Sequence, residues 1–296
     1  MKSKILKCLA LFGLVLSITS CDNKKLDEKD ILVNEAIDEY VTNYLIEDIK
    51  DDTLEEINGE WSNFTNYWSY LVVSELKDNG YSIDIKDNNK AIYNYIKDYD
   101  LDTLSGVDFG KYYYYAKAFD INLDSYKVKY KTFLETLGME YYDYGEYTIP
   151  FEIAPAKALE IENNNIHKIT NSTYKPSTDY GYDGYNWFYT SNVLFTTKVD
   201  NDYLEKISKE KYDNPTSIAL SIASFAASNV NVREEKYKTN NKDLVELLLE
   251  SYDSNLKLIK YDSKDTGINY STNQIYAGLI AYKYQRDNNK AVNIFR

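Results

Sequence analysis

Few side chains in this sequence belong to the types that carry out nucleophilic, metal or imidazole chemistry. The chain has a single histidine, His167, in the polar stretch NNNIHKITNS, and two cysteines, Cys8 and Cys21. His167 has no evident partner in its stretch, so we interpret it as a surface residue and not as a general base. The sequence therefore predicts no catalytic residue, no metal site and no cofactor.

Carboxylates are abundant but are not arranged in a recognisable motif. Asp98, Asp100 and Asp102 alternate along the chain and could direct oxygens at one hard cation. An EF-hand loop would need glycine at its sixth position, where Thr103 stands, so we expect a solvated loop. Two acids among the 47 Asp and Glu could flank a sugar, as in glycosidases, but no pair is singled out.

Aromatic side chains give the clearest binding signal. The chain has 32 tyrosines, and the stretch DYGYDGYNWFY gathers several aromatic residues where a loop meets an apolar segment. Aromatic rings with a polar tip suit stacking on a sugar or another flat ring. The sequence predicts a ligand-binding cluster of Tyr180, Tyr182, Tyr185, Trp187 and Tyr189. The alternative is that tyrosine serves as general core filler and that Trp187 anchors the core.

A run of four tyrosines, Tyr112 to Tyr115, covers a full helical turn. We expect some of them to pack in the core and others to face outward or into a cavity.

The N-terminus has the pattern of a secretory signal. Lys2, Lys4 and Lys7 precede an apolar run from Leu9 to Ile18. The run ITSC that follows resembles the lipobox of bacterial lipoproteins, in which cleavage precedes a cysteine that then carries the lipid. We expect a signal peptide over 1–20, lipidated Cys21 with a short tether over 21–25, and one folded domain over 26–296. The alternative is an ordinary secretory signal that happens to precede a cysteine.

The charge balance excludes some partners. Cleavage takes three lysines from the 34 basic residues and none of the 47 acidic ones, so the formal charge falls from −13 to −16. Such a surface repels nucleic acid and anionic lipid. Cys21 would be the single remaining cysteine, which leaves no intramolecular disulfide. We expect an extracytoplasmic protein of the bacterial cell envelope that is held at the membrane by lipid on Cys21.

For the folded domain that carries the candidate residues, the sequence predicts an all-α structure. Apolar residues recur at spacings of three and four, and Gly and Pro are few, at 11 and 4. Amphipathic segments alternate with segments that are apolar on all sides. The amphipathic segments are 26–50, 88–99, 126–138, 201–212 and 241–257, and residues 163–184 form a polar loop with room for a helical turn. The apolar segments are 65–80, 108–121, 150–162, 184–195, 214–229 and 271–285.

A helix that is apolar all round needs neighbours on every side. About six helical hairpins closing into a double ring would supply them, with amphipathic helices outside and apolar ones lining a central cavity. Small residues such as Ala277, Gly278 and Ala281 would let the inner helices approach closely. We expect Ala223 and Ala277 to be buried and Glu246 and Glu250 to be exposed.

Two stretches carry a resemblance to a known family. PTSIALSIASFA and STNQIYAGLIAY, with Thr216, Thr272 and Gln274, resemble the inner-helix repeats of prenyltransferase and squalene-cyclase-like α/α-toroid proteins, best over residues 200–296. The resemblance implies an α/α toroid. The catalytic motifs of that family are not matched, because the acids at 98, 100 and 102 are not adjacent and Cys21 alone cannot build a zinc site.

Two functions follow as hypotheses. The first is a non-catalytic envelope lipoprotein that binds a glycan, a small ring-bearing ligand or a surface protein through an aromatic-lined concave face. The second is a carbohydrate-active enzyme, a glycosidase or lyase of (α/α)6 shape, that uses carboxylates and tyrosine.

Overall fold

The computed structural model describes residues 26–58, 63–137, 145, 147–171, 181–196, 198–262 and 270–296. Of the residues in these ranges 63% are helical and almost none are in strands, which confirms the all-α prediction. Among the described helices we find none whose length and apolar character would let it cross a bilayer.

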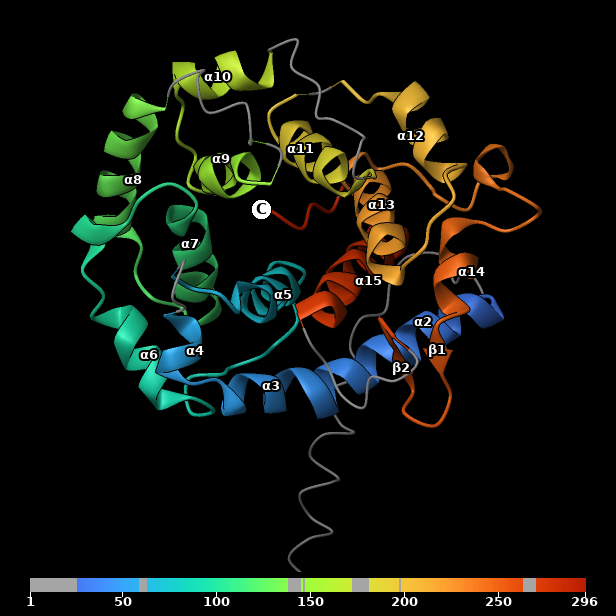
Figure 1. Ribbon diagram of the computed structural model, residues 1–296, viewed down its shortest axis with the longest axis horizontal. Coiled ribbons are helices and arrows are strands. Elements are labelled where there is room, and N and C mark those ends of the chain that lie inside the picture. The colour runs from blue at the N-terminus through green and yellow to red at the C-terminus, as the bar shows by residue number, and fades with distance from the viewer. Residues whose placement is uncertain are drawn as a thin grey trace, which may run out of the picture.

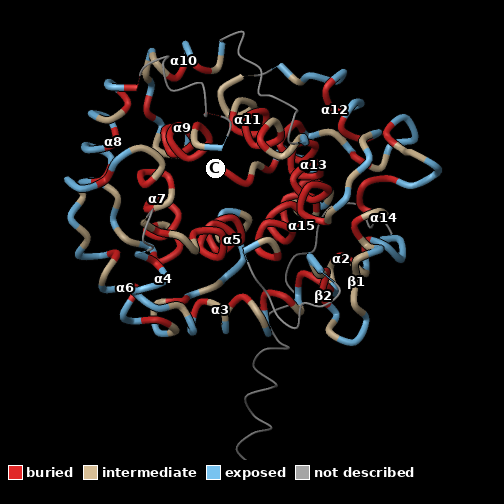
Figure 2. Tube along the Cα trace, viewed as in Figure 1, coloured by how far each residue is buried: buried red, intermediate tan, exposed pale blue. Residues whose placement is uncertain are grey.

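Six helices in the described ranges pack one on the next in a closed cycle, which we call the inner ring (Figure 1). Each of them is buried along most of its length (Figure 2). They correspond to the six apolar segments of the sequence. Their bounds are α5 (Tyr67–Asp78), α7 (Asp108–Ala118), α9 (Ile149–Ala158), α11 (Asp183–Val193), α13 (Pro215–Ala227) and α15 (Tyr270–Asn288).

The amphipathic helices lie around the outside of this ring (Figure 1). Their buried side chains face the inner helices and their charged faces are exposed, as the patterning predicted (Figure 2). They are α2 (Glu28–Glu39), continuous through the π-helical turn η1 (Tyr40–Leu45) into α3 (Ile46–Asp51), α6 (Lys90–Lys97), α8 (Asp124–Thr136), α10 (Asn164–Thr170), α12 (Asn201–Ser208) and α14 (Leu244–Leu249). Short turns complete the helical content: α4 (Leu54–Ile57), η2 (Leu101–Thr103) and η4 (Glu235–Tyr237).

Contacts between helix ends show that the inner helices run in the same direction. The first residues of α5 and α15 meet where the hydroxyl oxygens of Tyr67 and Tyr270 lie 2.6 Å apart, and Ser217 of α13 donates to Asp183 of α11 at 3.0 Å. We call this the entry end of the ring. The last turns of α5 and α7 meet at the opposite, exit end, where Lys117 pairs with Asp78.

Two glycines allow neighbouring inner helices to approach closely. A Cβ built on Gly110 of α7 would lie 1.9 Å from the carbonyl oxygen of Phe151 on α9, and one on Gly278 of α15 would lie 2.2 Å from that of Ala219 on α13. Such distances are far inside van der Waals contact, so only glycine fits. The predicted neighbours 214–229 and 271–285 are in contact, and Ala223 and Ala277 are fully buried.

Helix α2 and its continuation η1 pack on α15 and so tie the outer layer to the inner ring. Tyr40 stacks on Tyr276 with ring centroids 3.9 Å apart, and its hydroxyl donates to Asn273 at 2.7 Å. Tyr282 of α15 donates to Asp30 of α2 at 2.7 Å. These contacts join positions more than two hundred residues apart, so the fold depends on long-range packing.

A charged network stabilises the contact between α2 and α15. Arg286 Nη1 lies 2.9 Å from Asp30. Arg233 reaches Asp27 at 2.8 Å, Asp30 at 3.3 Å and Asp243 at 3.1 Å. The network therefore ties α2 to α15, to the start of α14 and to the loop that follows α13.

The segment 241–257 departs from the expected helix. Its helix α14 ends at Leu249, and the chain then forms an antiparallel hairpin of β1 (Tyr252–Asp253) and β2 (Leu258–Ile259). The Asp253 carboxylate accepts hydrogen bonds from the backbone N–H groups of Asn255 and Leu256, which favours the turn over a helix.

Three smaller expectations are also corrected. Glu246 is half-buried, because it pairs with Lys29 and completes a capping box with Asp243, whereas Glu250 is exposed as predicted. The apolar segment 65–80 was expected to begin at Thr65, but α5 begins at Tyr67 and the Thr65 hydroxyl donates to the Glu56 carbonyl. All four tyrosines from Tyr112 to Tyr115 are buried, so none faces outward, and Tyr113 lines a pocket at the exit end.

Candidate functional site

The predicted cluster at 180–189 divides between two sides of α11. Tyr180 lies outside the described residues. Tyr185 and Tyr189 face the outer helix α12, with ring centroids 4.6 Å from that of Tyr203 in each case. Tyr182 is half-buried, and the Lys206 ammonium of α12 lies 5.2 Å from its ring centroid.

Trp187 lies on the other side of α11, toward the centre of the ring, and is 7% exposed. Its ring centroid is 5.5 Å from those of Trp68 and Phe151 and 6.2 Å from that of Phe295. Trp187 therefore occupies the position of a core anchor. The structure does not bring it onto one surface with Tyr182, Tyr185 and Tyr189.

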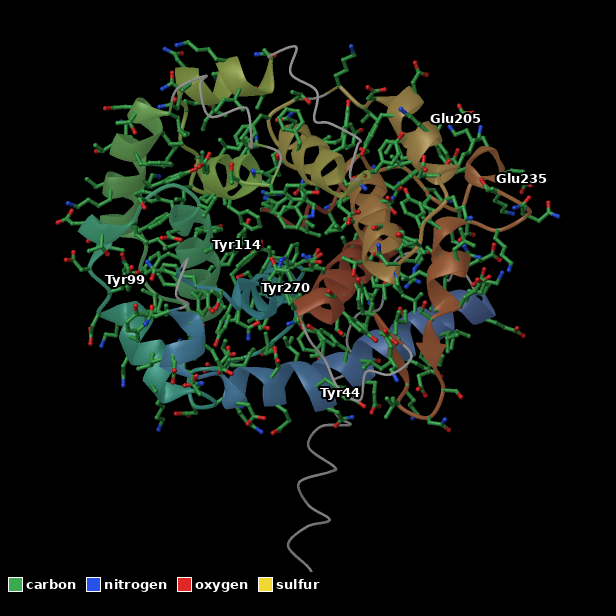
Figure 3. All side chains as sticks on the ribbon, in the orientation of Figure 1. Tyr44, Tyr99, Tyr114, Glu205, Glu235 and Tyr270 are labelled. Carbon is green, nitrogen blue, oxygen red and sulfur yellow. The ribbon has the colours of Figure 1, made fainter. Side chains whose placement is uncertain are left out.

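Aromatic side chains fill the centre of the ring where we expected an open cavity. Phe295, in the segment after α15, is fully buried and lies 5.4 Å from Phe151 and 6.4 Å from Trp68 between ring centroids. Tyr114 donates to the Phe295 carbonyl at 3.0 Å and lies near the centre (Figure 3). The segment that follows α15 thus places Phe295 in the centre of the inner ring.

This core reaches the surface at the entry end. Tyr147, which precedes α9, is 43% exposed and its ring centroid lies 5.3 Å from that of Trp187. Tyr270, at the start of α15, is 41% exposed and lies 6.2 Å from Trp68 between centroids (Figure 3). We call the connected group the entry-end aromatic cluster. Its members are Tyr67, Trp68, Tyr147, Phe151, Trp187 and Tyr270.

Sequence reasoning missed Tyr67, Tyr147 and Tyr270 as members of one group. Each lies within two residues of the start of an inner helix. Because inner helices that run in the same direction share one end, the aromatic residues at their first positions converge. The recurrence of an aromatic residue at the start of several inner helices was therefore the available signal. It can be recognised only when the inner helices are compared with one another.

Polar groups surround the entry-end aromatic cluster. The Lys111 ammonium lies 5.4 Å from the Tyr67 ring centroid, and burial lowers the pKa of Lys111. Burial raises the pKa of Glu152, in the first turn of α9, to about 7. Among the described residues, the indole Nε1 of Trp187 has no hydrogen-bond acceptor. Apolar ring faces with polar groups beside them fit a ligand that has both apolar faces and hydroxyls.

The other candidate residues have ordinary surface contacts. Asp102 pairs with Lys129, and Asp100 accepts from the backbone of Asp102 at the start of η2. His167 is exposed and its Nε2 lies 3.1 Å from Glu162. In the described ranges no group of three or more His, Cys, Asp or Glu is placed to hold a metal ion. Cys21 lies outside the described residues.

Comparison with protein-family models, with curated proteins and with solved structures finds no match to this chain.

Proposed function

We propose that the protein is a lipid-anchored binding protein of the bacterial cell envelope, and that its entry-end aromatic cluster binds a glycan without turning it over. The observation that carries this proposal is the pair of exposed tyrosines, Tyr147 and Tyr270, each in contact with a buried tryptophan. The buried rings hold the two exposed rings in place, so little side-chain freedom would be lost on binding.

The proposed fold is an α/α toroid of six hairpins. Support comes from the closed cycle of inner-helix contacts, from α15 packing on both α13 and α5, and from the alternation of apolar and amphipathic segments. In such an arrangement the starts of the inner helices share one face. That face would be the binding face.

The proposed anchor is lipid on Cys21, and its support is the sequence ITSC after an apolar run with three preceding lysines. Replacing Cys21 by alanine tests it. We expect the Cys21→Ala protein to lack the acyl mass and to be released or uncleaved. A variant that stays in the membrane fraction like the wild type would refute the anchor.

Stacking chemistry supports a glycan as the ligand. The C–H faces of a sugar ring pack on aromatic faces, and each such contact adds roughly 1 kcal/mol beyond the buried area. The hydroxyl of the exposed Tyr270, which is paired with that of Tyr67, would meet sugar hydroxyls. The acidic surface, with a formal charge of −13 over the whole chain, disfavours nucleic acid as a partner.

Binding is tested with Tyr147→Ala and Tyr270→Ala on a glycan panel, followed by tryptophan fluorescence. Trp68 and Trp187 lie against the two tyrosines, so a bound ring should change their emission. We expect each variant to lose roughly tenfold in affinity with little change in melting temperature. Tyr81→Ala is the matched control, because Tyr81 is 38% exposed and follows the exit end of α5. If Tyr147→Ala and Tyr270→Ala bound the glycan as tightly as Tyr81→Ala and the wild type, the proposal would be refuted.

The competing function is a glycan-cleaving enzyme, and one observation favours it. A carboxyl with a pKa of about 7, such as that of Glu152, suits a general acid or base at neutral pH. Mass spectrometry of the same glycan panel after incubation distinguishes the two. If the wild type cleaved a glycan and Glu152→Gln did not, the protein would be an enzyme and the binding proposal would be wrong.

A further inference from the structure

A pocket lies at the exit end, opposite the entry-end aromatic cluster. It has a volume of about 370 Å³ and lies between the last turns of α5 and α7 and the segment after α15. The polar side chains in its wall include Glu75, Asp78, Tyr113, Lys117, Asn293 and Arg296. This volume falls within the range of small-molecule sites in proteins.

Glu75 is the unusual residue in this wall. It is 3% exposed, and among the described residues neither of its carboxyl oxygens has a hydrogen-bond partner. Burial raises the pKa of Glu75 well above its ordinary value, which favours the neutral form of its carboxyl group. An unpaired buried carboxyl destabilises the fold unless something bonds to it.

Three of the neighbouring polar side chains, Asp78, Lys117 and Asn293, already have partners. Lys117 pairs with Asp78 and donates to the Arg296 carbonyl at 3.0 Å. The Asn293 amide donates to the Thr190 carbonyl at 2.6 Å. Among the described side chains in this wall, Glu75 is the one whose buried polar atoms lack a hydrogen-bond partner, and in its neutral form it offers one donor and free acceptor capacity.

From this geometry we propose that the exit-end pocket binds a small neutral polyhydroxy molecule, the size of a monosaccharide or cyclitol, through hydrogen bonds to the carboxyl group of Glu75. A hydroxyl both donates and accepts, so it complements a protonated carboxyl. A cationic ligand would meet Lys117 and Arg296, and an anionic ligand would meet Asp78. This site is independent of the entry-end aromatic cluster and of the glycan proposed to bind there.

The test uses the full chain, purified in a detergent without a sugar head group. Glucose, N-acetylglucosamine and myo-inositol are the probes, measured by thermal shift and by titration calorimetry. We expect at least one probe to raise the melting temperature of the wild type. Glu75→Gln, which keeps a donor and an acceptor, should retain binding, whereas Glu75→Leu should weaken it roughly tenfold or more.

Stability without a probe gives a second readout. Glu75→Leu removes an unpaired polar group from a buried site, so its melting temperature should equal or exceed that of the wild type. Glu205→Leu, on the outer helix α12, is the control and should bind the probe like the wild type (Figure 3). Tyr147→Ala and Tyr270→Ala should also leave this binding unchanged.

Several results would overturn the proposal. One is the absence of any effect of the three probes on the wild type. Another is equal binding by Glu75→Leu, and a third is a lower melting temperature of Glu75→Leu without probe, which would show that the carboxyl has a structural partner. A fourth result comes from titration calorimetry in two buffers that differ in ionisation enthalpy, which measures the protons released on binding. Release of a proton on binding would show that Glu75 ionises, which a neutral ligand does not require.

Discussion

The Cα atom of Gly278 on α15 faces the carbonyl oxygen of Ala219 on α13, at a distance that leaves no room for a side chain. The obstacle is backbone, so it cannot rotate away. We expect Gly278→Ala to lower the free energy of unfolding by about 1–3 kcal/mol or more, as overpacked substitutions do.

Helix propensity acts in the opposite direction at this position, because alanine is favoured over glycine by about 1 kcal/mol. Urea unfolding measures the net effect. Ala91→Gly on the exposed side of α6 reports the propensity difference alone. A Gly278→Ala protein more stable than the wild type would show that α13 and α15 are not in close contact.

Trp187 provides a test of the ring centre. Its side chain contacts Trp68, Phe151 and Phe295, so Trp187→Ala should cost about 3–5 kcal/mol of stability. Tyr182→Ala, at the half-buried start of the same helix, should cost much less. Denaturant unfolding of both variants gives the comparison. An unchanged midpoint for Trp187→Ala would place the residue outside the core.

Arg233 provides a test of the charged network. Its guanidinium is the partner of Asp243, whose side chain is 1% exposed. Arg233→Met would leave that carboxylate buried without its cation, at a cost of about 3–5 kcal/mol. Lys238→Met, which breaks the more exposed pair with Glu235, should cost about 0–1 kcal/mol. Thermal unfolding separates the two, and equal effects would count against a structural role for the network.

Stability should depend on pH through two buried carboxyls. Burial raises the pKa of Glu152 from 4.5 and that of Asp52 from 3.8, each to about 7. Between the unfolded and folded values the folded protein binds more protons than the unfolded chain. The free energy of unfolding therefore falls as pH rises through that window and levels off above about pH 7.

Between about pH 5.5 and about pH 8 each carboxyl contributes on the order of 2 kcal/mol to this change, since about 1.5 pH units lie below the folded pKa and one unit corresponds to about 1.4 kcal/mol. Urea unfolding at about pH 5.5 and about pH 8 measures it. Glu152→Gln and Asp52→Asn should each flatten the dependence, whereas Glu250→Gln, at an exposed site, should not. A protein that is more stable at the higher pH would contradict the prediction.

Helix positions were predictable to within a few residues because periodicity and end signals agreed. Residues 214–229 were expected to form an inner helix, and α13 spans Pro215–Ala227 with Asn214 capping its first turn. Residues 271–285 became α15, which extends three residues further. The hairpin after α14 was missed, because the apolar spacing of Leu244, Leu248 and Tyr252 continues to the point where Asp253 forms its turn.

The candidate site was less predictable, because residues close in the chain diverge on a helix. Tyr185 and Trp187 are two positions apart, which places them about 200° apart around α11. One faces the outer layer and the other the ring centre. Glu75 left a different signal: a carboxylate between Val73 and Leu76 in a helix expected to be apolar all round. Its isolation from partners became visible only with the neighbouring helices in place.

Helix α15 is synthesised after the helices that it contacts, and this order has a consequence for folding. Tyr282 bonds to Asp30 across 252 positions, and α15 contacts α5, α13 and α2. A chain emerging N-terminus first holds α2 and α5 long before α15 arrives. Until then the apolar faces of α5 and α13 have no partner between them. Folding should therefore end in one late step, and a chaperone that shields these apolar faces would assist folding more than one that acts on α2 and α3.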